Sequence, residues 1–127
     1  MKMLLAIALG GAIGAVSRYG VVVAAGRWFG FGFPWGTLAV NIVGSLVIGL
    51  MFQMLEHRFP GIDPAWRGLI VVGFLGALTT YSSFALDAAD LFLRGEIAAV
   101  SIYISATLIG ALTGVASGLA IGKMLWA

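Results

Sequence analysis

The sequence predicts an all-α integral membrane protein with four transmembrane helices. Of its 127 residues, 61% are hydrophobic and only 9% are charged, whereas a soluble domain carries about 25% charged residues. The apolar residues also form four stretches, each near the roughly 20 residues that a helix needs to cross a bilayer core of about 30 Å. The composition excludes a soluble globular enzyme, because so few polar residues cannot cover a water-facing surface.

The four expected spans make up a single transmembrane domain over residues 1–127. Their approximate bounds are 3–25, 33–55, 68–90 (uncharged as far as Leu86) and 97–122. The links between them concentrate charged residues, glycine and proline, as turns at a membrane surface do. The first stretch follows Lys2 and is longer than the apolar core of a signal peptide, with no convincing small-residue cleavage site after it. We therefore expect it to be a retained helix.

Lysines and arginines in short loops set the orientation of a membrane protein. With four spans, both ends of the chain lie on one side, and that side carries Lys2, Arg58, Arg67 and Lys123. The other side carries Arg27 and Arg94, and also Arg18 if this residue lies near that end. So small a difference is compatible with insertion in both orientations, which would allow two opposed copies to pair as an antiparallel homodimer. A single orientation is the open alternative.

Several function classes find no support in the residues. The chain has no cysteine, which excludes disulfides and thiolate metal sites. Its seven basic residues form no clustered basic face of the kind that nucleic-acid binding requires. The single histidine, His57, stands between Glu56 and Arg58 in the second link, and we expect it to be a solvated interfacial residue.

Small residues recur at every fourth position in two of the spans. They are Ala6, Gly10 and Gly14 in the first span, and Ala106, Gly110, Gly114, Gly118 and Gly122 in the fourth. Membrane helices associate through the close packing of such residues. The spacing therefore predicts packing seams between helices, and it also suggests a subunit interface.

Polar side chains at bilayer depth are costly and are candidates for function. Asn41 lies near the middle of the second span, with Thr37 and Ser45 one turn away on the same face. Its amide can donate hydrogen bonds to a ligand, or it can join two helices. Arg18 is the basic residue that lies well inside a span; it either snorkels to the lipid headgroups or attracts anions in a water-filled vestibule.

The third span contains an unusual polar segment, Gly-Phe-Leu-Gly-Ala-Leu-Thr-Thr-Tyr-Ser-Ser-Phe at 73–84. Glycine, serine and threonine weaken a helix, so we expect the helix to be broken near midplane, close to Gly76–Thr79. Carbonyl groups freed by such a break can coordinate a small cation. Tyr81 and Phe84 share one helical face, and their positively polarised ring edges could favour an anion; simple packing is the alternative.

Three motifs in register resemble the Fluc (CrcB-type) fluoride channels over essentially the whole chain. They are Gly-Gly-Ala-Ile-Gly-Ala-Val-Ser-Arg-Tyr at 10–19, Pro-Trp-Gly-Thr-Leu-Ala-Val-Asn at 34–41, and the segment 73–84. The resemblance implies an antiparallel, dual-topology homodimer with two pathways in the cell (inner) membrane, surrounded by lipid. It also implies passive export of fluoride, which relieves the toxicity of this ion.

The same resemblance implies which residues act. The implied fluoride pathway consists of Asn41, Tyr81, Phe84, Thr37, Ser82, Ser83, Tyr103, Thr107 and Arg18, the last as a vestibule arginine. A structural Na⁺ that is not transported is implied at the main-chain carbonyls of Gly76 and Thr79, two from each subunit. The sequence departs from the family pattern at Tyr81 (usually Phe), Ala77 (usually Gly), Ala111 (serine in other members) and Asp87 (usually Glu).

Two other functions compete with a channel. A small multidrug exporter has a similar length and span number. Exporters of this kind look as if they need a membrane-embedded carboxylate in the first span, and here that span has none. A non-transporting scaffold would use the same polar residues only to join helices. Fluoride fits the residues better, because a strongly hydrated small anion needs donors that replace water, while formal charges in the pore would hold it too tightly to conduct.

Overall fold

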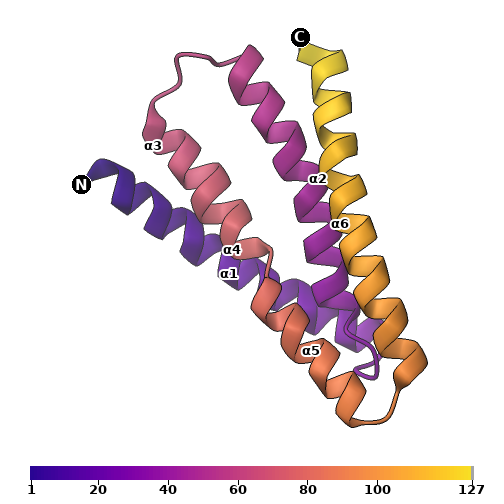
Figure 1. Cartoon of the computed structure of the whole chain (residues 1–127). Helices are drawn as coiled ribbons and strands as arrows, with labels where there is room; N and C mark the ends of the chain where they lie inside the picture. Colours follow the sequence, from indigo (N-terminus) through magenta and orange to yellow (C-terminus); the bar gives the residue numbers. More distant parts are fainter. Residues whose placement is uncertain (127) are drawn as a thin grey trace.

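The computed structural model describes residues 1–126 and contains four helical segments that are long and apolar enough to cross a membrane. They are α1 (Lys2–Phe29), α2 (Trp35–His57), the third span Pro64–Leu93 and α6 (Ile97–Trp126). The third span consists of α3 (Pro64–Arg67), the π-helix η1 (Gly68–Leu75), α4 (Gly76–Leu78) and α5 (Tyr81–Leu93) (Figure 1). The predicted all-α membrane fold with four spans is confirmed, with each helix extending a few residues beyond the predicted apolar stretch at one end or both.

Glycines end two of the long helices. Gly30 follows α1 with a φ of 85°, and Gly95 lies between α5 and α6 with a φ of 77°. Both values lie in the left-handed region, which glycine adopts without steric cost. The chain therefore reverses direction in short links at one end of the molecule, where the α1–α2 and α5–α6 connections lie (Figure 1).

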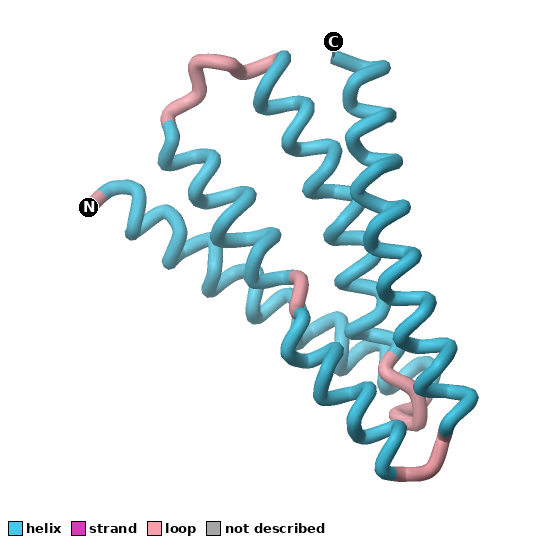
Figure 2. The backbone as a smooth tube through the Cα atoms, viewed as in Figure 1, coloured by secondary structure: helices cyan, strands magenta, loops and turns pink. Residues whose placement is uncertain are grey.

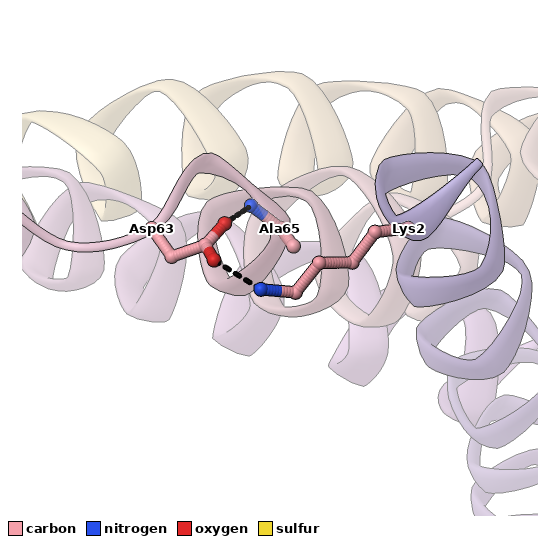
Figure 3. Close-up of polar contacts among 3 residues, drawn as sticks. All are labelled: Lys2, Asp63 and Ala65. Carbon is pink, nitrogen blue, oxygen red and sulfur yellow. Dashed lines mark hydrogen bonds and ion pairs between the residues drawn. The ribbon is translucent and has the colours of Figure 1, made fainter.

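At the other end, Asp63 starts the third span and also ties it to the beginning of the chain. Its Oδ1 accepts a hydrogen bond from the backbone N–H of Ala65 at 2.9 Å, so it caps α3. Its Oδ2 pairs with the ammonium group of Lys2, which begins α1 (Figure 3). The hydrogen bond from Lys2, more than the backbone bond from Ala65, lowers the pKa of the Asp63 carboxyl below its ordinary value of 3.8.

The helices pack as two pairs. The helix α6 runs beside α2 along its length, and α1 packs against η1 and α4. The two pairs lie close together at the end that holds the α1–α2 link and spread apart toward the two termini (Figure 2).

Glycines allow the backbones within each pair to touch. A Cβ atom at Gly118 would lie 2.2 Å from the carbonyl oxygen of Leu46 in α2, and one at Gly10 would lie 2.1 Å from that of Leu69 in η1. The predicted packing seams are thus confirmed. Helices of the same chain cover both glycine faces, and the expected subunit interface stays a prediction.

The third span bends between α4 and α5. Thr79 and Thr80 have extended backbone, with ψ values of 155° and 121° (Figure 2, the short loop between the two helices). The sequence placed irregular backbone near Gly76–Thr79, but Gly76 is itself helical. The π-helical turns of η1 before the bend were not predicted, because eight apolar and glycine residues give no local signal that separates a π-helix from an α-helix.

Candidate functional site

The side chain of Asn41 holds the bend in place from α2. Its Nδ2 donates to the carbonyl oxygen of Thr80 at 3.0 Å, and its Oδ1 accepts from the N–H of Thr80 at 2.7 Å. A Cβ atom at Gly44, one turn along α2, would lie 2.4 Å from Cγ2 of Thr79. The close approach that this glycine allows therefore brings the bend within reach of the amide. The second N–H of the Asn41 amide is left for another acceptor.

The bend removes several carbonyl groups from their helical partners. In a continuous helix the N–H of residue i+4 would bond to each carbonyl. Here the N–H of Thr80 donates to Asn41, and that of Ser83 donates to Oγ1 of Thr80 at 3.1 Å. Within residues 1–126 no hydrogen bond reaches the carbonyl oxygens of Gly76 and Thr79.

These two freed carbonyls are the positions at which a structural cation was expected. Neutral main-chain carbonyls suit a hard cation, and both residues line one cavity. Within the described part of the chain no group of three histidine or acidic side chains could hold a metal. Any cation at this site would therefore depend on carbonyl oxygens.

A cavity of about 420 Å³ opens beside the bend. It is lined by Asn41, Ser45, Gly76, Thr79, Thr80, Tyr81, Phe84, Thr107, Leu108, Ala111 and Leu112. The structure thus brings together six of the residues predicted from the sequence: Asn41, Gly76, Thr79, Tyr81, Phe84 and Thr107. No formally charged side chain lines it, so its polar character comes from an amide, hydroxyls and backbone groups.

Thr107 contributes an unusual polar group to this cavity. Its residue is only 4% exposed, and its hydroxyl oxygen is buried without a hydrogen-bond partner in the part of the chain that the structure describes. A buried hydroxyl in that state costs about 1–3 kcal/mol. A ligand that accepted its proton would remove this cost.

The two aromatic residues of the predicted pair behave differently. Phe84 is 7% exposed, whereas Tyr81 is 78% exposed. Their ring centroids are 5.7 Å apart at an interplanar angle of 49°. In the single chain Tyr81 is therefore largely exposed although it lines the cavity, and the expectation that both rings present their edges inward stays a prediction.

Tyr103 lies deeper than the cavity. It is completely buried, its ring contacts Phe84 with centroids 5.3 Å apart, and its hydroxyl donates to Oδ2 of Asp87 at 3.1 Å. Asp87 and the buried Thr37 line a second, smaller cavity of about 160 Å³ near the α1–α2 link. Tyr103 therefore contacts one lining residue of each of two cavities that both hold predicted pathway residues.

Arg18, Ser83 and Ser82 do not line the cavity beside the bend. Arg18 and Ser83 line a third cavity of about 270 Å³ on the α1 side. Ser82 is exposed, with its hydroxyl 3.4 Å from that of Thr80. Arg18 does not snorkel to the surface; its guanidinium donates to Ser83 Oγ and to the carbonyl of Ala77.

Thr80 is the important residue that the sequence did not single out. Its backbone bonds to Asn41, and its side chain caps α5 by accepting from the N–H of Ser83. A hydroxyl residue three positions before a serine is compatible with an N-cap. In a run of six hydroxyl and aromatic residues (79–84), however, this spacing does not identify which residue is the cap.

Comparison with known proteins adds an independent line of information. The family model described as CrcB-like protein, Camphor Resistance (CrcB), matches residues 5–119. The fluoride-specific ion channel FluC of Rhizobium etli (strain CIAT 652) is 50% identical over 119 residues, which is 94% of each chain. The protein of the same name from Agrobacterium fabrum is 48% identical over 120 residues (94% of this chain, 95% of the relative), and that from Hahella chejuensis is 44% identical over 119 residues (94% and 93%).

Proposed function

We propose that this chain, which belongs to the CrcB-like family of fluoride ion channels, conducts fluoride passively out of the cell through its inner membrane. The family consists of channels and not of enzymes, and four apolar spans make this a multi-pass membrane protein. The observation that carries the proposal is the cavity beside the bend. It offers an amide N–H of Asn41 and the unpartnered hydroxyl of Thr107, with no formal charge on its walls.

This chemistry suits fluoride because the ion must exchange its water for protein donors and then leave again. Neutral donors replace hydration without the tight binding that a lysine or arginine in the path would produce. Phe84 supplies a polarised ring edge beside the same cavity. Tyr103 and Thr37 continue the polar groups toward the second cavity, so we place the pathway along this line.

The family resemblance also implies a structural Na⁺, and the freed carbonyls of Gly76 and Thr79 fit such a site. These two residues would hold the ion, which would supply a positive field near the anion cavity without a charged side chain. Asn41 contributes by taking the Thr80 N–H that would otherwise bond to the Gly76 carbonyl.

We further propose that two copies associate as an antiparallel homodimer, with lipid around the remaining faces. The nearly balanced distribution of basic residues supports insertion in both orientations. The exposed ring of Tyr81, at the rim of the polar cavity, supports a second copy that completes the wall there.

The test is fluoride efflux from liposomes that contain the purified protein. We expect fluoride to leave and chloride to stay. The Asn41→Asp variant should abolish efflux, since a carboxylate repels the anion. Gln53→Ala is the control, because it removes an amide from the same helix outside the cavity, and it should conduct. No fluoride efflux from the unmodified protein would refute the channel and favour a scaffold.

A further inference from the structure

Arg18 contacts the third span on both sides of its bend. Its Nε donates to the carbonyl oxygen of Ala77 at 3.1 Å, and its Nη1 donates to Oγ of Ser83 at 3.2 Å. Ala77 precedes the extended residues and Ser83 follows them. One side chain of α1 therefore bridges α4 and α5, and it replaces the helical donor that the carbonyl of Ala77 has lost.

This contact also uses an acceptor position of the Ser83 hydroxyl. A serine hydroxyl has two acceptor positions and one proton. Oγ of Ser83 accepts from Arg18 and also from Oγ1 of Thr80, at 3.1 Å. With both acceptor positions used, the Ser83 proton is free to point into the cavity that Ser83 and Arg18 line.

The same bonds continue to the candidate pathway. Thr80 donates to Ser83 through its hydroxyl, and its backbone N–H and carbonyl are both held by the Asn41 amide. A continuous series of hydrogen bonds thus runs from Arg18 in α1, through Ser83 and Thr80 at the bend, to Asn41 in α2.

We propose that Arg18 is a positioning residue, which fixes Thr80 and Ser83 and thereby sets the Asn41 amide that faces the fluoride cavity. This inference rests on the proposed channel function. The geometry requires the guanidinium and not merely its charge, because a planar fork of donors reaches two acceptors at once, whereas a lysine ammonium is a single point of charge. An arginine that only attracted anions would be replaceable by lysine.

The first experiment measures fluoride efflux for Arg18→Lys, Ser83→Ala and the double variant, with Arg27→Lys as control. Arg27 lies on the same helix and is exposed at its end. We expect Arg18→Lys to lose about tenfold in maximal flux per folded channel. The loss should persist at high ionic strength, which screens simple attraction, and the double variant should lose little more than either single one. Flux of Arg18→Lys at the wild-type rate, or losses that multiply, would overturn the inference.

A second measurement is independent of transport. Amide hydrogen exchange at Thr80 and Ser83 should become faster in Arg18→Lys, while exchange in the middle of α6 should be unchanged. Unchanged amide exchange at both Thr80 and Ser83 would refute the positioning role of Arg18 even if fluoride flux fell. Conversely, if the wild-type protein passes no fluoride but Arg18→Lys still exchanges faster at Thr80 and Ser83, the channel function is refuted and the positioning role of Arg18 is retained.

Discussion

The pair α2–α6 and the bend of the third span satisfy their backbones in opposite ways. Along α2–α6 the helices are continuous, so their carbonyls bond within the helix, and small residues let the backbones touch, as at Gly118 and Leu46. At the bend the N–H of Thr79 still bonds to the carbonyl of Leu75, but Thr80 and the carbonyl of Ala77 have lost their helical partners. Side chains from two other helices replace them, Asn41 at Thr80 and Arg18 at Ala77. Irregular backbone inside a membrane is tolerated only where protein or water satisfies it.

The comparison teaches why the functional residues gather where they do. A bend inside the bilayer requires polar side chains that bond to its backbone. These side chains have more hydrogen-bond donors than the backbone uses. Asn41 keeps one N–H, and Ser83 keeps its proton. The seam between α2 and α6 needs only close contact, and its glycines offer no side-chain donor. In the proposed channel, structure and transport thus share residues at the bend and are separate at the seam.

The largest effect on stability is expected from Asn41→Ala. This change leaves the N–H and the carbonyl of Thr80 without partners, and each buried unpaired group costs about 1–3 kcal/mol. We expect a loss of roughly 3 kcal/mol in the free energy of unfolding, measured by denaturant titration of helical circular dichroism in detergent. Gln53→Ala is the control, since the Oε1 of Gln53 is buried without a partner in residues 1–126. An equal loss in both variants would show that the bend does not depend on the amide.

The next effect tests the seam. In Gly118→Ala the new methyl group would lie 2.2 Å from the Leu46 carbonyl oxygen, which is backbone and cannot rotate away. Overpacking of this kind costs typically about 1–3 kcal/mol. Gly11→Ala is the matched control, because a Cβ atom there meets nothing within 4 Å, and alanine favours the helix by about 1 kcal/mol. We expect the melting temperatures to move in opposite directions, and a shift of the same sign would contradict the proposed close contact.

A third change separates stability from transport. Thr107→Val removes an unpartnered buried hydroxyl while keeping its shape, so the free energy of unfolding should stay the same or rise by about 1 kcal/mol. Fluoride efflux should nevertheless fall, since the cavity loses a donor. Thr113→Val on the exposed face of the same helix is the control; its hydroxyl donates to the carbonyl of Ile109. Loss of stability without loss of efflux would make Thr107 a structural residue.

The regular parts of the molecule could be predicted from the sequence because their signals are local. Hydropathy over about 20 residues predicts the spans, and the four-residue spacing of Gly110, Gly114 and Gly118 predicts a packing seam on the fourth span, though not its partner α2. The single asparagine in the middle of the second span was also identifiable as a candidate site residue, and it lines the cavity beside the bend. In each case the information lies within one helix.

The details of the bend depend on partners far along the chain, and the sequence could not supply them. Arg18 bonds to residues 59 and 65 positions away, and Asn41 bonds to a residue 39 positions away. Local propensity placed the irregular backbone near Gly76–Thr79, whereas these tertiary bonds favour Thr79–Thr80. The 78% exposure of Tyr81 was likewise not predicted, since Tyr81 and Phe84 share one helical face.

The smallest effect concerns the ion pair between Lys2, at the start of α1, and Asp63, at the start of the third span. The pKa of Asp63 is lowered in the folded protein, so its contribution to stability is complete above about pH 3.8 and is lost as the pH falls through the folded value. Asp63→Asn keeps an oxygen to cap α3 but removes the charge, and it should lower the melting temperature slightly at pH 7. The difference from wild type should shrink below pH 3.8 and at high salt, because the pair is exposed. Lys2→Gln should give the same shift, and the two changes together should add nothing; additive shifts would mean that the two residues act separately.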